Sequence, residues 1–202
     1  MSTCQRKAKH SLIILAGGQS RRMGSSKPHL LVNNKRLIDI VASKLKPLFD
    51  ETIVVVKKGM DIIEPYNTVK DNFDGYSPLY GILEGLKNSS SFINFVIACD
   101  MPFVQPELIR FLVRKAGETQ ADVVVPVVNG FYEPLCAVYT KNCIKAIEES
   151  IREGNLKVTS FYSKVKVYAV PEDLIKQYDE SLWSFVNINT REDLKRVIDI
   201  ID

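Results

Sequence analysis

Short apolar runs alternate with amphipathic segments along most of the chain. Continuous runs rich in β-branched residues predict strands that are buried on both faces. Apolar residues repeated at spacings of three and four predict helices with one buried face. We expect strands at residues 12–16, 52–56, 92–99, 122–128, 131–139 and 165–170. We expect helices at 36–48, from Pro78, from Pro106 to about Ala116, at 142–152, and after a cap at Thr190.

This order of elements predicts an α/β fold with three layers, in which a mostly parallel, Rossmann-like sheet carries helices on both faces. One antiparallel pair is expected, because 131–139 follows 122–128 too closely for a crossover connection. Ligands bind beyond the carboxyl ends of the strands in such sheets. The loops after Ala16, Val56 and Cys99 should therefore meet at one crevice. We expect one domain over residues 1–202, with 1–10 as a flexible tail.

Composition narrows the class of protein further. Apolar residues make up 46% of the 202 residues, which is enough for a sizeable core. The net charge of +3 is too small to argue for a nucleic-acid partner. No segment approaches the ~18 apolar residues of a membrane span, and the apolar run behind the basic first ten residues is too short for a signal peptide. The four cysteines lack metal-binding spacing, and Cys99 lies in an apolar run, so we expect a buried thiol and a cytoplasmic protein.

A glycine-rich loop follows the first predicted strand, in the sequence LIILAGGQSRRMGSSKP from residue 12 to 28. Its spacing fits neither the P-loop nor the dinucleotide fingerprint. Gly17 and Gly18 lack side chains, so a ligand can approach their N–H groups closely. Arg21 and Arg22 offer forked donors suited to phosphate oxygens, and Lys27 adds a compact charge. The pattern predicts a phosphate-binding loop; the alternative is a tight turn with solvated basic residues.

Two aspartates are candidates for the same crevice. Asp100 comes abruptly at the end of a buried apolar run, where a carboxylate beside a polyphosphate is suited to bind Mg²⁺. It lies too early in the chain to cap the helix that begins at Pro106. Asp71 lies in a polar stretch before a helix, and on local grounds it is equally well an ordinary turn residue. Gly81, inside that helix, suggests close packing or close approach of a ligand.

Other polar positions leave the chemistry open. Glu133 is either a surface residue at the start of a strand or part of a site. Asn187 and Asn189 precede the last predicted helix, where Asn189 or Thr190 would cap it. The only histidines are at positions 10 and 29, and the hydrolase and zinc motifs GxSxG and HExxH are missing from the sequence. The inventory therefore favours electrostatic stabilisation of charge on phosphorus by cations and a metal.

Four motifs together carry a resemblance to a known family. LAGGQSRRMGSSKP resembles the loop LAGG-x-S/A-x-RMG-x-x-K of the molybdenum cofactor guanylyltransferases, a family of nucleotidyltransferases. CDMPF resembles the metal-binding loop of that family, and YEPLCAVY resembles its strand EPLxAxY. FVNINTREDL resembles its segment FxNINTPEDL, with Arg191 where proline is usual. These matches occur in the family's order between residues 12 and 194.

The resemblance implies a fold of the nucleotide-diphospho-sugar transferase type and a Mg²⁺-dependent reaction. GMP would pass from GTP to the terminal phosphate of the molybdopterin cofactor, giving the guanine dinucleotide form and pyrophosphate without a covalent enzyme intermediate. The nucleotide would be bound by residues of the loop and the strand ends, namely Leu15, Ala16, Gly17, Gly18, Arg21, Lys27, Asp71 and Asp100. Lys27, Arg22 and Asp100 would be the catalytic residues, with Asp100 as the Mg²⁺ ligand. The pterin-facing residues would be Glu133, Asn187 and Asn189.

The resemblance also implies partners, and it leaves alternatives. Proteins that deliver the cofactor and molybdoenzymes that receive it are the implied protein partners, and the chain would be a monomer or a weak oligomer. Lys57 stands where relatives often carry asparagine, which leaves one nucleotide contact open. A cytidylyltransferase acting on the same cofactor, or an enzyme with another phosphorylated acceptor, would share these motifs. A non-catalytic GTP-binding or cofactor-carrying protein is the alternative of another class, although simple binding does not require Asp100.

Overall fold

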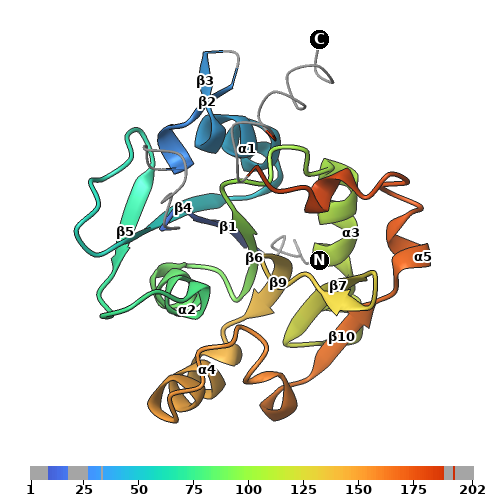
Figure 1. The fold of residues 1–202 in the computed structure, drawn as a ribbon. Helices are drawn as coiled ribbons and strands as arrows, with labels where there is room; N and C mark the ends of the chain where they lie inside the picture. Colours follow the sequence, from blue (N-terminus) through green and yellow to red (C-terminus); the bar gives the residue numbers. More distant parts are fainter. Residues whose placement is uncertain (1–8, 18–26, 33, 189–192, 194–202) are drawn as a thin grey trace, which may run out of the picture.

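The computed structural model describes residues 9–17, 27–32, 34–188 and 193, and of residue 27 only the backbone. Its main sheet has eight strands, and a separate two-stranded ribbon comprises β2 (Leu31–Val32) and β3 (Lys35–Arg36). The strands of the main sheet are β1 (His10–Leu15), β4 (Glu51–Lys57), β5 (Asn67–Asp71), β6 (Ile93–Ala98), β7 (Val123–Val128), β8 (Phe131–Tyr132), β9 (Cys136–Thr140) and β10 (Val167–Val170). Their spatial order is β10-β7-β9-β6-β1-β4-β5 (Figure 1). β8 pairs with β7 beside this row.

The pairing of the strands is largely parallel, as the sequence predicts. β6, β1, β4 and β5 are mutually parallel neighbours, and β10 is parallel to β7. The expectation of one antiparallel pair is too low, because β9 runs antiparallel to both β6 and β7, and β8 is antiparallel to β7. A two-residue turn with positive φ at Asn129 and Gly130 reverses the chain between β7 and β8. The next strand, β9, lies between β6 and β7 and pairs with both of them.

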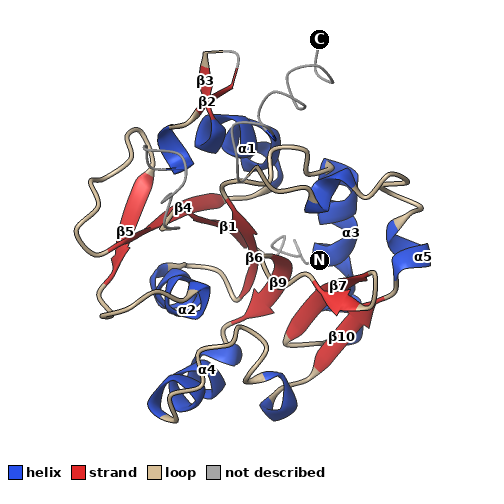
Figure 2. Cartoon of the chain, viewed as in Figure 1, coloured by secondary structure: helices blue, strands red, loops and turns tan. Residues whose placement is uncertain are grey.

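Helices cover both faces of the sheet and form the two outer layers (Figure 2). The α-helices are α1 (Leu37–Leu45), α2 (Pro78–Asn88), α3 (Pro106–Thr119), α4 (Cys143–Arg152) and the short α5 (Glu172–Ile175). Short 3-10 segments are η1 (Lys27–His29), η2 (Lys46–Leu48), η3 (Tyr162–Lys164) and η4 (Trp183–Phe185). One buried core joins α1, α3 and α5 to the sheet, and a second core on the opposite face joins α2 and α4. The predicted three-layer arrangement is confirmed.

Differences from the predicted elements have local causes. β5 was not predicted, because its sequence NTVKD is polar and half-exposed at the edge of the sheet. The predicted helix at 36–48 ends as an α-helix at Leu45 and continues as η2, which contains Pro47. The short α5 carried too little periodicity to be recognised. The helix expected after Thr190 lies outside the described residues.

α2 lies unusually close to β1, and two glycines explain why. A Cβ atom on Gly85 would lie 2.5 Å from Cγ2 of Ile13, and one on Gly81 would lie 3.1 Å from Cδ2 of Leu15. The distance at Gly81 supports close packing as one of the two reasons expected for this glycine. Ser77 caps α2 through its Oγ, which accepts from the N–H of Leu79 at 3.1 Å. This contact fixes the start of the helix at the edge of the sheet where the strands end.

Three cysteines, Cys99, Cys136 and Cys143, are buried, as expected for Cys99. Burial raises the pKa of Cys143 to about 12, so this thiol is protonated at neutral pH. None of the helices in the described part of the chain is long and apolar enough to cross a membrane.

Candidate active site

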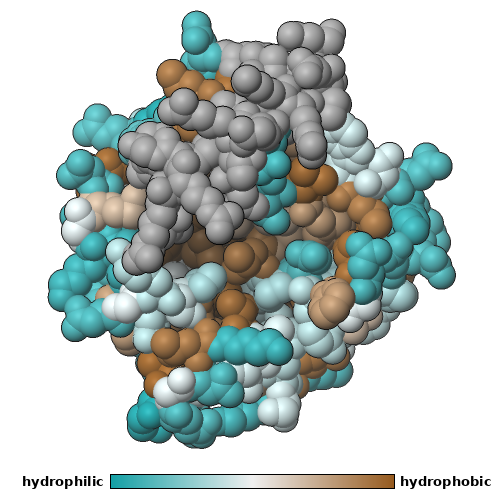
Figure 3. Space-filling view, viewed as in Figure 1, coloured by the Kyte–Doolittle hydropathy of each residue, from teal (hydrophilic) through white to brown (hydrophobic). Residues whose placement is uncertain are grey.

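A cavity of about 440 Å³ lies at the carboxyl ends of β1, β4, β5 and β6. In the space-filling view, apolar residues form the floor of a hollow near the middle of the molecular face shown (Figure 3). The lining residues come from six separate stretches of the chain and are Leu15, Gly17, Val55, Lys57, Asp71, Tyr76, Ser77, Pro78, Gly81, Ala98, Cys99, Asp100, Leu135 and Asn187. The crevice predicted where the loops after the first three strands meet is therefore present, with Gly17, Lys57 and Asp100 brought together.

The end of β1 is fixed between its two neighbours. The carbonyl of Leu15 accepts from the N–H of Cys99 at 3.0 Å, and the N–H of Ala16 donates to the carbonyl of Val55 at 2.8 Å. Leu15 and Gly17 line the cavity, whereas Ala16 is fully buried. A Cβ atom on Gly17 would lie 3.1 Å from the backbone nitrogen of Lys57, so glycine lets the chain pass close over β4. The glycine-rich loop thus leaves the sheet from a rigid origin.

Most of that loop lies outside the described residues, including Gly18, Arg21 and Arg22. Lys27 begins η1, and only its backbone is described. The roles expected for these four residues stay predictions.

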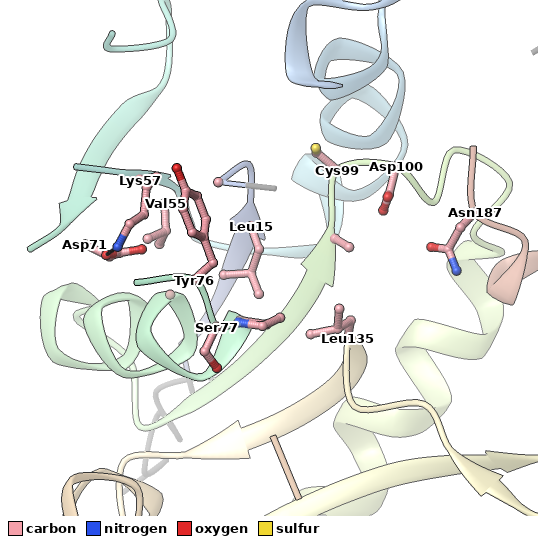
Figure 4. Close-up of a pocket in the computed structure, with 14 residues that line it drawn as sticks. Leu15, Val55, Lys57, Asp71, Tyr76, Ser77, Cys99, Asp100, Leu135 and Asn187 are labelled. Atoms are coloured by element: carbon pink, nitrogen blue, oxygen red, sulfur yellow. Dashed lines mark hydrogen bonds and ion pairs between the residues drawn. The ribbon is translucent and has the colours of Figure 1, made fainter. Parts of the chain in front are cut away.

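Asp100 lies at the opposite side of the cavity from Asp71 (Figure 4). Its side chain is nearly buried, and its backbone carbonyl accepts from the N–H of Ile188 at 2.9 Å. Two residues later, the carbonyl of Pro102 accepts from Nζ of Lys44 at 2.6 Å. Partial burial of this ammonium lowers the pKa of Lys44. The loop that carries Asp100 is thus held both by α1 and by the segment near residue 188.

Asn187 also lines the cavity, beside Asp100 (Figure 4). The buried carboxylate of Asp179 orders the preceding turn, since it accepts from the N–H groups of Trp183 at 3.1 Å and Ser184 at 2.7 Å. Oγ of Ser184 in turn accepts from the N–H of Gln105 at 2.9 Å. Asn187 and Asp100 of the CDMPF loop therefore line the same cavity, whereas Asn189 lies outside the described residues.

The residues present fit a magnesium ion that is held by one carboxylate. Asp100 supplies a hard oxygen donor that faces the cavity. In the part of the chain that the structure describes, no group of three His, Cys, Asp or Glu side chains could hold a metal by itself. Mg²⁺ commonly takes one or two carboxylates and completes its coordination with phosphate oxygens and water. A site of this kind forms only together with a phosphorylated ligand.

The other end of the cavity contains a buried ion pair. Nζ of Lys57 lies 2.8 Å from Oδ1 of Asp71, and both side chains are about nine-tenths buried. The same ammonium donates to the carbonyl of Phe73 and lies 5.6 Å from the ring centres of Tyr76 and Tyr80. Asp71 is the last residue of β5 and lines the cavity, so it is not an ordinary turn residue.

Glu133 is half-buried, and burial raises the pKa of its carboxyl group. It is not one of the described residues that line the cavity, but Leu135 is. The carbonyl of Leu135 accepts from the N–H of Ala98 at 3.0 Å, which ties this segment to the end of β6.

Several lining residues were missed by sequence reasoning. Val55, Tyr76, Ser77, Pro78 and Leu135 were not named as site residues, and Lys57 was noted only as a departure from the family. The pair Ser77-Pro78 carried a usable signal, because a serine before a proline marks a helix start and the helix start lies at the carboxyl edge of the sheet. Tyr76 carried none, since an exposed tyrosine in a turn is common.

Comparison with known proteins places these features in context. The model of the MobA-like NTP transferase domain family matches residues 12–166. A protein of Natranaerobius thermophilus named "probable molybdenum cofactor guanylyltransferase" is 39% identical over 191 residues, covering 92% of this chain and 93% of that protein. The molybdenum cofactor guanylyltransferase of Desulfosudis oleivorans is 35% identical, covering 91% and 92%. The crystal structure of molybdopterin-guanine dinucleotide biosynthesis protein A from Archaeoglobus fulgidus superposes with a TM-score of 0.82 at 29% identity, covering 95% and 98%.

Proposed function

The chain belongs to the family of MobA-like NTP transferase domains, and we propose that it transfers GMP from GTP to the terminal phosphate of molybdopterin, releasing pyrophosphate. The observation that carries this proposal is the single cavity that joins the origin of the glycine-rich loop, Asp71, Asp100 and Asn187. The loop origin, Asp100 and Asn187 belong to motifs that resemble those of molybdenum cofactor guanylyltransferases, and relatives of that name match about nine-tenths of the chain.

The two ends of the cavity suggest how the substrates lie. The Lys57–Asp71 end, with its apolar floor and tyrosines, suits the nucleobase. The glycine-rich loop begins at Gly17, so the triphosphate would lie along it, held by Gly18, Arg21, Arg22 and Lys27. The pterin would then approach from the side of Asn187, Asn189 and Glu133, so that its phosphate faces the α-phosphorus of GTP.

The chemistry asked of the protein is mainly positioning and neutralisation of charge. The pterin phosphate attacks the α-phosphorus directly, and pyrophosphate leaves. Asp100 would hold Mg²⁺, which supplies positive charge to the phosphate oxygens when it is bound. Arg22 and Lys27 would follow the charge that develops on the departing pyrophosphate. Leu15 and Ala16 would contact the nucleotide through their backbone, and the bonds of the Leu15 carbonyl and the Ala16 N–H to the neighbouring strands give the loop a rigid origin.

A cytidylyltransferase of the same cofactor is the nearest alternative, since the phosphate-binding parts do not read the base. The test is to incubate the purified protein with molybdopterin, Mg²⁺ and each nucleoside triphosphate in turn, while following pyrophosphate release. We expect release with GTP and the guanine dinucleotide cofactor as the product. Preference for CTP, or turnover only with another phosphorylated acceptor, would contradict the proposal. Binding of GTP without turnover would favour a carrier.

We further propose that the protein works in the cytoplasm, because the three buried thiols among its described residues suit a reducing compartment. Its protein partners would be those that deliver molybdopterin and those that accept the finished cofactor.

A further inference from the structure

The ammonium of Lys57 organises the base end of the cavity. It comes from the last residue of β4 and contacts the end of β5 and two residues of the segment that joins β5 to α2. One N–H donates to Oδ1 of Asp71 at 2.8 Å, a second donates to the carbonyl of Phe73, and the ring of Tyr76 lies 5.6 Å from Nζ. Lys57 therefore holds this segment against the cavity wall.

The pair retains two hydrogen-bonding groups that the described residues do not use. An ammonium has three N–H donors, and in the described part of the chain Lys57 uses two of them. Oδ1 of Asp71 also accepts from the N–H of Phe73 at 3.3 Å, whereas no hydrogen bond within the described residues uses Oδ2. Both side chains line the cavity beside Tyr76 (Figure 4). One donor and one acceptor are thus available side by side at a buried position.

We propose that Lys57 is a specificity-determining residue, which together with Asp71 reads a purine edge that presents an acceptor next to a donor. Guanine has that edge, with O6 as the acceptor and N1–H as the donor, whereas adenine presents a 6-amino donor next to the N1 acceptor. Nζ would donate to O6, and Oδ2 of Asp71 would accept from N1–H. With adenine, the Nζ donor would face the 6-amino donor, and the Oδ2 acceptor would face the N1 acceptor. Buried polar groups left unpaired in this way discriminate strongly between ligands.

This inference rests on the proposed function, since it assigns the nucleobase to this end of the cavity. Its test compares GTP, ITP and ATP on the wild-type protein, on Lys57→Met and on Lys58→Met. Methionine keeps the length and apolar stem of lysine without its donors. Lys58 is a matched control, because its side chain is 59% exposed and, among the described residues, it pairs with the exposed Asp74. ITP lacks the exocyclic amine of GTP but retains O6 and N1–H.

We expect the wild type to prefer GTP and ITP over ATP. In Lys57→Met, kcat/KM for GTP and ITP should fall about 10- to 100-fold, the contribution of a hydrogen bond from a charged donor. The loss should lie in KM, with kcat little changed, and the ratio of GTP to ATP should fall by a similar factor. Lys58→Met should match the wild type. Equal losses for GTP and ATP would mean that Lys57 only braces the loop, and would overturn the proposal.

Two further measurements keep the outcomes distinct. If Lys57→Met fails to fold because Asp71 is left buried without its partner, the double variant Lys57→Met/Asp71→Asn removes both charges and is assayed with the same nucleotides. It should bind GTP and ATP with similar affinity, and a retained preference for GTP would refute the reading role. Absence of turnover by the wild type with GTP and molybdopterin would instead contradict the proposed function.

Discussion

The hydroxyl of Tyr139 is expected to hold the segment that enters the site before β9. Tyr139 is fully buried, and its OH donates to the carbonyl of Pro134 at 2.8 Å. The OH of Tyr162 lies 3.0 Å from the OH of Tyr139. Because Tyr139 has one hydroxyl proton and a carbonyl can only accept, Tyr162 donates to Tyr139. Leu135, which lines the cavity, follows directly after the anchored carbonyl.

Substitution Tyr139→Phe removes both hydrogen bonds and leaves the partly buried Pro134 carbonyl without this donor. A buried polar group left unpaired costs about 1–3 kcal/mol, so we expect a loss of about 2 kcal/mol in the free energy of unfolding. For a chain of this size that is a fall in Tm of about 4–8 °C. Tyr162→Phe is the matched control, because Tyr139 can still donate to Pro134. It removes one hydrogen bond and should cost about 0.5–1.5 kcal/mol.

Thermal unfolding followed by circular dichroism measures the stability of both variants, and steady-state kinetics measures their effect on the site. We expect KM for molybdopterin to rise in Tyr139→Phe, because Leu135 lies on the side assigned to the pterin, while KM for GTP stays near the wild-type value. In Tyr162→Phe both KM values should be unchanged. A Tm for Tyr139→Phe at or above that of Tyr162→Phe would refute the hydrogen-bond assignment.

Three further predictions follow from single groups. Asp100→Asn should lower kcat at least about 100-fold, because electrostatic stabilisation of the reacting phosphate is lost. The affinity for GTP, measured by calorimetry, should be partly retained. Normal turnover by this variant would exclude the metal-binding role of Asp100. Gly85→Ala places a Cβ atom 2.5 Å from Cγ2 of Ile13 and should lower the free energy of unfolding, measured by chemical denaturation, by about 1–3 kcal/mol. Gly117→Ala, with open space around the new Cβ atom, should raise it by up to about 1 kcal/mol. Equal effects of the two variants would contradict the close packing of α2 on β1. Burial raises the pKa of Glu133 in the folded protein, so ionisation of this carboxyl group increasingly opposes folding as the pH rises through that pKa. Glu133→Gln should therefore raise Tm more at pH 7 than at pH 4. A gain in Tm that does not depend on pH would contradict this role of burial.

The parts of the fold that follow from local pattern were predictable from the sequence. The apolar runs at β1, β4 and β6 are long enough to require burial on both faces, and they predict a sheet covered by helices. β5 lies at the edge and carries a polar, half-exposed sequence, so it has no such signature. What makes it a strand is its ladder to β4, which is a tertiary interaction and cannot be read from residues 67–71 alone.

The site was predictable to the extent that it follows from strand ends. Asp100 was found because a carboxylate directly after a buried strand is conspicuous, and Gly17 because adjacent glycines need a reason. Lys57 escaped assignment for the opposite reason, since a lysine at the end of a strand is ordinarily a solvated residue. Its burial depends on Asp71, which is brought beside it only when β5 pairs with β4. A charge pair formed across two strands leaves no mark in either sequence segment by itself.

The reversed direction of β9 explains how the two halves of the site come together. In a wholly parallel sheet, only residues that follow strands reach the carboxyl edge. β9 runs antiparallel to β6, with Cys136 opposite Ile97, so the residues that precede β9 lie at the edge where β6 ends. Leu135 thereby bonds to Ala98, two residues before Asp100, and enters the same cavity. A single strand of opposite direction thus lets a segment more than thirty residues beyond Asp100 form the wall on which the second substrate is expected to dock.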